Sequence, residues 1–346
     1  MPNSQTAMYI LGGIILSVLV TACYTRRPEF GRKPKGSRLD KIKQQKNYKD
    51  GEFQNLEYTP SLTEGYSVWK VIKKSMFQAS DRKKPSDSIP VMKTNILGLD
   101  PKEDVLIWFG HSSYYMQLGG KKILVDPVFS GYAAPVRWMV NAFEDTDQYH
   151  AEDFPQIDYL LISHDHYDHL DYRTSLALKD KVNHVICGLG IGAHYERWGY
   201  DTSKIIETNW HEKLELDSGF TIHTTPTRHF SGRGFKRNNT LWQSYVIDTP
   251  NQKVYVGGDS GYGKHFAAIG EKFGPFDLAI MENGQYDSAW CNVHTLPTEF
   301  LQAAKDLKAK RVLPVHSGKF ALANHAWDEP LKTVSELNKK EQIPLV

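Results

Sequence analysis

The chain has 346 residues, of which 40% are hydrophobic and 24% are charged, enough apolar material for one large domain or two ordinary ones with a buried core. A formal net charge of +2 gives no indication of a nucleic-acid partner, and we expect none. Three cysteines, Cys23, Cys187 and Cys291, occur without a C-x-x-C spacing, which excludes a disulfide framework.

The first residues have the pattern of a membrane-directing segment. Residues 9–20, YILGGIILSVLV, have the length of a signal-peptide core and are short for a spanning helix. The following VTAC, residues 20–23, resembles the lipobox of bacterial lipoproteins, in which Cys23 is lipidated and becomes the mature N-terminus. A simple membrane anchor and an ordinary cleaved signal remain alternatives, because residues 1–8 contain no Lys or Arg. We expect a membrane-anchored protein of the bacterial cell envelope.

A basic stretch follows this segment. Residues 26–50 contain ten Lys/Arg and three Asp/Glu, so they suit a position near anionic lipid headgroups or a solvated linker. Residues 24–100 have weak periodicity and are predicted to be a basic linker and an irregular N-terminal extension.

From residue 101 to 346 the pattern is that of one folded domain. Short strands are predicted first, and strands then alternate with helices, which favours an α/β fold with two sheets and helices outside them. The predicted strands are 105–109, 114–118, 122–126, 157–163, 183–188, 203–208, 219–225, 241–248, 253–258, 277–281 and 311–315. The predicted helices lie near 191–199, 263–272, 297–309 and 328–340.

A dense group of ligand-type side chains follows the apolar strand 157–163. The stretch LISHDHYDHLDY, residues 160–171, contains His164, His166, Asp168 and His169. Side chains two apart in an extended segment point the same way, so His164 and His166 can meet on one cation, while Asp168 and His169 face a second position. Imidazole and carboxylate are ligands of zinc and its neighbours.

Three later strand ends supply further ligands. His229 follows the strand 219–225, Asp259 follows 253–258, and His316 follows 311–315. Because α/β proteins build their sites at the carboxyl ends of strands, we interpret the set as one metal site.

These residues resemble the metallo-β-lactamase superfamily, and within it the branch of N-acyl-phosphatidylethanolamine-hydrolysing phospholipase D. The resemblance covers residues from about 47 to 340 and implies a four-layer αββα sandwich with a dinuclear metal centre. The stretches that narrow it to this branch are KDGEFQN (49–55), WFGHSS (108–113), ILVDPVFS (123–130), LISHDHYDHLDY (160–171), GGDSGY (257–262), FGPFDLAI (273–280) and HSGKFALANHAWDEP (316–330).

The resemblance also implies a role for each residue. His164, His166 and His229 would hold the first metal, Asp168, His169 and His316 the second, and Asp259 would bridge both. His294 matches a histidine near the substrate phosphate, and Asp168 is a further candidate proton acceptor. His111 matches a position that we interpret as orienting a ligand. Zinc is the leading metal, with manganese and iron as alternatives.

The implied function is a metal-dependent hydrolase of the phospholipase D type, in which a metal-bridging hydroxide attacks the phosphorus of a lipid phosphodiester. A lactonase or soluble phosphodiesterase of the same fold is one alternative, and a non-catalytic envelope lipoprotein is another. Expected partners are a phospholipid or other phosphodiester and a membrane surface. Residues 131–156, with Tyr132, Trp138, Met139 and Phe143, are interpreted as a lid or acyl contact, or as an ordinary amphipathic loop. Tyr286 and Trp290 are expected on the rim of the pocket near His294.

Overall fold

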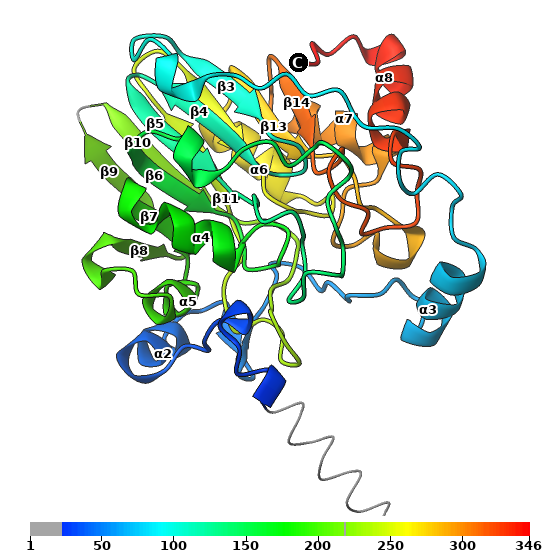
Figure 1. The fold of residues 1–346 in the computed structure, drawn as a ribbon, viewed down its shortest axis with the longest axis horizontal. Coiled ribbons are helices and arrows are strands. Elements are labelled where there is room, and N and C mark those ends of the chain that lie inside the picture. Colours follow the sequence, from blue (N-terminus) through cyan, green and yellow to red (C-terminus); the bar gives the residue numbers. More distant parts are fainter. Residues whose placement is uncertain (1–22, 218) are drawn as a thin grey trace, which may run out of the picture.

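The computed structural model describes residues 23–217 and 219–346, and two six-stranded sheets form the centre of the fold (Figure 1). The first sheet has the order β3-β4-β5-β6-β7-β8. Its strands are β3 (Val105–Trp108), β4 (Tyr114–Leu118), β5 (Lys121–Val125), β6 (Ile157–Ile162), β7 (Val182–Gly188) and β8 (Ile205–Thr208). The first three are antiparallel, and β5 to β8 are parallel. The parallel strand β6 is almost wholly apolar because both faces of the sheet are covered.

The second sheet places several strand ends at one edge. Its order is β14-β13-β12-β11-β10-β9. The strands are β9 (Lys213–Asp217), β10 (Phe220–Thr225), β11 (Ser244–Asp248), β12 (Lys253–Val256), β13 (Leu278–Glu282) and β14 (Val312–Val315). Both β10 and β12 are antiparallel to β11, and β12, β13 and β14 are parallel. The strands β10, β12, β13 and β14 therefore share a direction, and their carboxyl ends meet at the same edge.

The helices cover the outer faces of the two sheets (Figure 1). One buried cluster, including Leu161 and Val256, lies between the sheets. On the outside of the first sheet pack α4 (Tyr172–Leu178) and α5 (Gly192–Arg197), and on the outside of the second pack α6 (His265–Phe273), α7 (Pro297–Asp306) and α8 (Glu329–Glu341). The apolar faces of these helices bury the outer face of each sheet, and the result is a layered sandwich.

The N-terminal extension packs on this sandwich. It contains α2 (Gly36–Lys43), the two-stranded hairpin of β1 (Tyr48–Lys49) and β2 (Glu52–Phe53), and α3 (Val68–Phe77). Ile42 and Phe53 are fully buried and contact a cluster that includes Leu241 and Trp242. Burial of two large apolar side chains contributes on the order of 3–6 kcal/mol, so this part of the extension is held firmly.

Every strand and helix that the sequence predicts between residues 105 and 340 is present. The helices α2, α3 and α4 and the strands β1, β2 and β9 were not predicted. The predicted membrane-directing segment lies outside the described residues except for Cys23, which is exposed. In the part of the chain that the structure describes, no helix combines the length and the apolar character needed to cross a membrane.

Candidate metal centre

The carboxyl ends of strands from both sheets bring the predicted ligands together. His164, His166, Asp168 and His169 follow β6, while His229, Asp259 and His316 follow β10, β12 and β14. Their ligand atoms fall into groups whose members lie within 4.8 Å of one another. One group is His164, His166 and His229, and another is His111, Asp168, His169 and His316. The first group holds the three ligands predicted for one metal, and the second holds those predicted for the other together with His111; we call them the two half-sites. Two further groups, His164 with His169 and Asp259, and Asp259 with Glu282, His294 and His316, overlap with them, so the predicted ligands form one cluster.

Asp259 lies between the two groups. Its Oδ2 is 3.2 Å from Nε2 of His169, 3.7 Å from Nε2 of His229 and 3.8 Å from Nε2 of His164. Its Oδ1 is 3.1 Å from Nδ1 of His316. One carboxylate therefore faces histidines of both predicted half-sites.

Three imidazoles converge in the first half-site with lone pairs available. Nε2 of His164 and Nε2 of His229 lie 2.8 and 3.3 Å from Nδ1 of His166. Nδ1 of His229 donates to the carbonyl oxygen of Val293 at 2.8 Å, so its Nε2 carries the lone pair. Burial lowers the pKa of His164 and of His229 well below the ordinary value, and both rings are neutral.

The carboxylates of the site are ionised. Burial opposes their charge, but His169 and neighbouring histidines outweigh it and lower the pKa of Asp168 and of Asp259 well below the usual range. Burial also disfavours a charged His169, but Asp259, Asp168 and Asp126 outweigh it and raise the pKa of His169 well above its ordinary value. A cation bound here would displace that proton, because only the unprotonated nitrogen is a ligand.

The residues present fit a pair of divalent cations. Within the described residues, Nε2 of His316 is buried and has no hydrogen-bond partner, although a buried polar atom is costly unless something binds it. Neutral imidazoles and ionised carboxylates surround this atom, and they are the donor set of zinc, manganese and iron sites.

Neighbouring side chains fix the orientation of the ligands. Asp126, at the end of β5, accepts from Nδ1 of His169 at 2.8 Å and from the backbone N–H of Ser163 at 2.8 Å. Nε2 of His111 is hydrogen-bonded to Oδ2 of Asp168 at 2.8 Å, and Oγ of Ser112 to Nδ1 of His316 at 2.8 Å. The expectation that His111 orients a ligand agrees with this contact.

Two histidines of the site adopt strained backbone conformations. His111 and His316 have φ values of 53° and 70°, in the left-handed region that residues with a Cβ rarely occupy. Two backbone hydrogen bonds hold them there, from His316 N to His111 O at 2.9 Å and from His111 N to Ser317 O at 2.7 Å. The surrounding structure therefore imposes a conformation that costs about 1–3 kcal/mol at each residue, as is typical of functional sites.

The N-terminal extension reaches the site through one side chain. Asn55, just after β2, donates to the carbonyl oxygen of His229 at 2.7 Å and accepts from the N–H of His229 at 3.1 Å. It also accepts from Nε1 of Trp242 at 3.0 Å. The extension thus fixes the backbone of a ligand.

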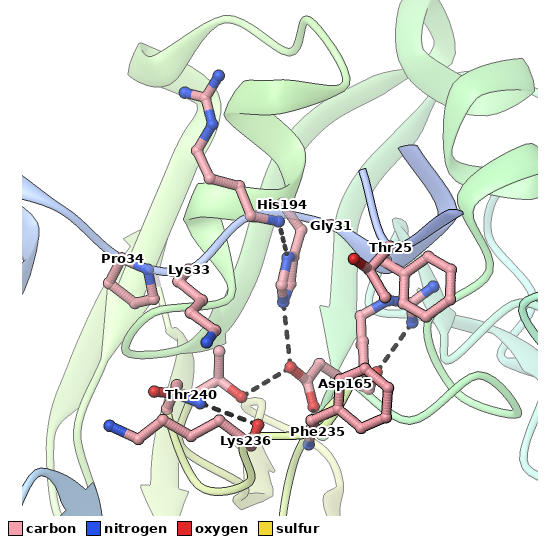
Figure 2. Close-up of a pocket in the computed structure, with 15 residues that line it drawn as sticks. Thr25, Gly31, Lys33, Pro34, Asp165, His194, Phe235, Lys236 and Thr240 are labelled. Atoms are coloured by element: carbon pink, nitrogen blue, oxygen red, sulfur yellow. Dashed lines mark hydrogen bonds and ion pairs between the residues drawn. The ribbon is translucent and has the colours of Figure 1, made fainter. Parts of the chain in front are cut away.

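Asp165, between two ligand histidines, joins the metal-site loop to the N-terminal strap of residues 26–34 (Figure 2). Its carboxylate accepts from Nε2 of His194 at 3.0 Å and from Oγ1 of Thr240 at 2.8 Å. Nδ1 of His194 in turn accepts from the backbone N–H of Arg32 at 2.8 Å. Nearby, the buried guanidinium of Arg233 donates to the carbonyl oxygens of Glu29 and Asp165. Asp165, His194, Arg233 and Thr240 all line a cavity of about 350 Å³.

His294, which is partly buried, forms an ion pair with a buried carboxylate beside the predicted ligands. Its Nδ1 donates to Oε2 of Glu282 at 2.7 Å, and Glu282 falls in one group with Asp259, His294 and His316. Burial disfavours a charged ring, but the Glu282 carboxylate outweighs it and raises the pKa of His294 to about 9. Burial raises the pKa of Glu282 to about 7. His294 is therefore placed to hold a proton at the edge of the metal cluster.

An apolar groove ends at His294. It has a volume of about 520 Å³, and its walls include Val71, Ile72, Phe230, Trp290 and Val293. The positively charged side chain of Arg237 also lines it. Trp290 lies on this groove, as expected. Tyr286 was wrongly placed there, because it is buried, contacts His325 and donates to Glu329 at 3.1 Å.

The segment 131–156 is only partly the exposed lid that its sequence suggests. Trp138 and Met139 are exposed, whereas Tyr132 and Phe143 are buried. Tyr132 accepts from Nε of Arg173, and the backbone N–H of Phe143 donates to Lys319 O. The alternative of a loop packed on the sandwich describes these two residues better.

Several residues of the site were not predicted from the sequence. Asp126 and Glu282 stand at the ends of β5 and β13, and the strand-end rule that found Asp259 would have identified them. Asn55 and His194 carry no such signal, because each acts across more than 150 residues of sequence.

Comparison with known proteins identifies relatives of this chain. Residues 121–317 match a family described as a beta-lactamase superfamily domain. An uncharacterised protein of Mycobacterium tuberculosis is 35% identical over 304 residues, covering 87% of this chain and 82% of the relative. The N-acyl-phosphatidylethanolamine-hydrolyzing phospholipase D 1 of Caenorhabditis elegans is 28% identical, covering 82% of this chain and 84% of the relative. Among solved structures, the metallo hydrolase Igni18 of Ignicoccus hospitalis has a TM-score of 0.53 at 21% identity, covering 70% of this chain and 93% of that chain.

Proposed function

The chain belongs to the metallo-β-lactamase superfamily as a metal-dependent hydrolase that resembles N-acyl-phosphatidylethanolamine-hydrolysing phospholipase D, and we propose that it hydrolyses phosphodiester lipids of that kind. The observation that supports a lipid substrate is the apolar groove of about 520 Å³, which reaches His294 beside the cluster of proposed ligands. A groove lined by aliphatic and aromatic side chains suits an acyl chain, whereas a soluble nucleotide or lactone would gain little from it.

Seven side chains would hold two cations. His164, His166 and His229 form one set, Asp168, His169 and His316 the other, and Asp259 would be shared between them. When bound, a pair of divalent cations supplies Lewis acidity and lowers the pKa of a coordinated water. Zinc is the metal we propose first, and manganese and iron have the same ligand preferences.

The proposed reaction replaces one phosphorus–oxygen bond with another. The oxygen of a water adds to the phosphorus, and the bond to the N-acylethanolamine oxygen breaks. His294, held protonated by Glu282, is placed to donate a proton to the departing oxygen or to hydrogen-bond the phosphate. Asp168 is held by His111 and stays ionised, which favours a ligand role over a proton-accepting one. The products are phosphatidic acid and an N-acylethanolamine.

The test uses the full chain with three substrates: N-acylphosphatidylethanolamine in vesicles, a soluble aryl phosphodiester and a sugar lactone. We expect turnover of the lipid, with release of phosphatidic acid. Turnover of the soluble diester or the lactone without the lipid would replace this proposal by the alternative activity. No turnover of any ester by the metal-loaded chain would favour a non-catalytic envelope protein.

A substitution tests the shared ligand. Asp259→Asn should lower the metal content below two equivalents and reduce turnover by more than about a thousandfold, because a neutral amide bridges two cations poorly. Asp248→Asn is the matched control, since Asp248 lies on β11 and contacts only a surface partner, Lys253, at 3.4 Å. Two equivalents of metal in Asp259→Asn would contradict the bridging role.

The predicted envelope location stays a proposal and is tested separately. Cys23→Ser should leave the precursor uncleaved and change its partition into membranes if Cys23 is the lipidated residue.

A further inference from the structure

Exposed apolar side chains gather around helix α3. Of the 17 large hydrophobic residues that are exposed in the described part of the chain, eight lie between residues 56 and 77. Trp69 is 80% exposed, Phe77 75% and Met76 69%. Isolated exposed apolar residues are ordinary, but a continuous group of this size marks a surface that contacts something apolar.

Four of the six apolar residues of α3 lie on one side of the helix. At about 100° per residue, Val68, Trp69, Ile72 and Met76 fall within an arc of about 100° around the helix axis. We call these four residues the α3 arc. Lys73 follows at the edge of the arc, and Lys70 and Lys74 lie on the opposite side of the helix. This division into an apolar side and a cationic side is typical of helices that lie in the plane of a membrane surface.

The N-terminal side of α3 and its Lys74 contact residues 287–288, just before Trp290 of the groove. Nζ of Lys74 contacts Asp287 at 2.8 Å, and the hydroxyl of Tyr66, just before the helix, is 2.8 Å from Oγ of Ser288. Val68 and Ile72 of the arc, together with Val71, form part of the wall of the groove, which His294 also lines. In Figure 1, α3 projects from the body of the protein at this side. The α3 arc is therefore adjacent to the entrance of the proposed active site.

Charge around α3 favours one partner. Residues 68–84 contain six Lys/Arg and one Asp. Lys74 and Arg82 pair with Asp287 and Asp328, which leaves an excess of positive charge beside the arc. A second copy of this chain would bring the same cations against one another, whereas a surface of anionic phospholipid complements them.

We propose that α3 is an interfacial helix whose arc inserts into a bilayer containing anionic phospholipid and places the groove entrance at the lipid surface. This inference deepens the proposed function, on which its biological meaning rests, but the contact itself requires no particular substrate. It is also separate from the predicted anchor in residues 1–23, because it concerns the orientation of the domain on the membrane.

The experiment is hydroxyl-radical footprinting of the full chain in vesicles of phosphatidylcholine with a minority of phosphatidylglycerol. A local readout is needed because the predicted anchor would dominate bulk binding. Met76 is compared with Met92, which is 89% exposed and lies in the segment between α3 and β3. We expect Met76 to be oxidised at least about fivefold more slowly than Met92, because a side chain in the acyl boundary is shielded from radicals formed in water. Replacing phosphatidylglycerol by phosphatidylcholine should reduce this protection.

A double variant tests whether the protection of Met76 depends on the exposed apolar side chains of α3. Val68→Ser with Trp69→Ser removes two exposed apolar side chains of the α3 arc and should return Met76 to the oxidation rate of Met92. The matched control is Val91→Ser, an exposed apolar residue outside α3, which should leave Met76 protected. Equal oxidation of Met76 and Met92 in the unmodified chain would overturn the inference. So would protection that rises with protein concentration at constant lipid, since that result assigns the arc to a second copy.

The outcomes separate this inference from the proposed function. His166→Ala should abolish turnover and leave Met76 protected. Protection without any lipid turnover would leave the interfacial helix standing and remove the lipid substrate. Turnover of vesicle lipid with Met76 unprotected would do the opposite.

Discussion

His294 and Glu282 illustrate how single residues set the chemistry of the site. An isolated histidine loses its proton near neutral pH, but Oε2 of Glu282 accepts from Nδ1 of His294 and the pKa of the ring rises to about 9. Glu282 is itself positioned by the backbone N–H groups of Ser260 and Thr295, at 3.0 and 2.8 Å. The proton of His294 is therefore available across the neutral range.

Replacing Glu282 by Gln should change the pH dependence of turnover. The amide keeps an oxygen for Ser260 and Thr295 but removes the negative charge, so the pKa of His294 falls. Because a proton donor is active only while protonated, activity is lost as pH rises through that pKa. The descending limb of kcat/KM should move to lower pH, with a loss of about tenfold or more near pH ~8.

Metal analysis accompanies this pH profile and should give the same content as the unmodified chain. Glu299→Gln is the matched control, because Glu299 only caps α7 through the N–H of Leu296. An unchanged descending limb in Glu282→Gln would show that His294 does not supply the proton.

Among the residues of the site, the proposed ligands were predictable from the sequence, whereas the residues that orient them were not. His164, His166, Asp168 and His169 form a cluster within six residues that is rare outside metal sites. Asn55, by contrast, is one amide in a polar stretch, and only the fold brings it to His229, 174 residues away. A sequence pattern identifies functional residues that are close together in the chain. It does not identify a residue, such as Asn55, that reaches the site only through the fold.

Among the elements, the strands of the sandwich were predictable because their apolar runs are bounded by turns. α4 was missed because it has only seven residues, although Asp171 caps it by accepting from Arg173 N and Thr174 N. α3 was missed for another reason. Its apolar residues face solvent, so the usual interpretation of an amphipathic pattern as core packing does not apply.

The hairpin of β1 and β2 leads to a prediction about metal affinity. Asn55→Ala should free the backbone of His229 and weaken metal binding by about 10–100-fold, the usual effect of losing a group that orients a ligand. Competition with a chromophoric chelator measures this change.

Asn47→Ala is the control from the same hairpin. Asn47 contacts Asn209 at 2.9 Å and touches no ligand, so its loss should affect stability without changing metal affinity. Equal metal affinities in the two variants would show that the extension does not support the site.

For the whole molecule, the metal centre joins the two sheets at one edge. Four of the proposed ligands follow β6 of the first sheet, and the other three follow β10, β12 and β14 of the second. Without cations, two carboxylates with strongly lowered pKa values and several neutral imidazoles remain buried together. Loaded cations should therefore stabilise the contact between the sheets as well as the reaction.

Removing the metal should lower the thermal stability of the full chain. A cation present at about a thousand times its Kd contributes about 4 kcal/mol, because it binds only the folded state. At about 2.1 cal/mol/K of unfolding entropy per residue, such a loss lowers the Tm of a chain of 346 residues by about 5–6 °C. Differential scanning calorimetry before and after chelation measures the shift, and addition of zinc or manganese should reverse it. Asp259→Asn should show a smaller shift because it binds less metal, while Asp248→Asn should show the full one. A Tm that chelation leaves unchanged, with metal analysis confirming removal, would mean that the strand ends are held together by the protein alone, and that the cations serve only the chemistry.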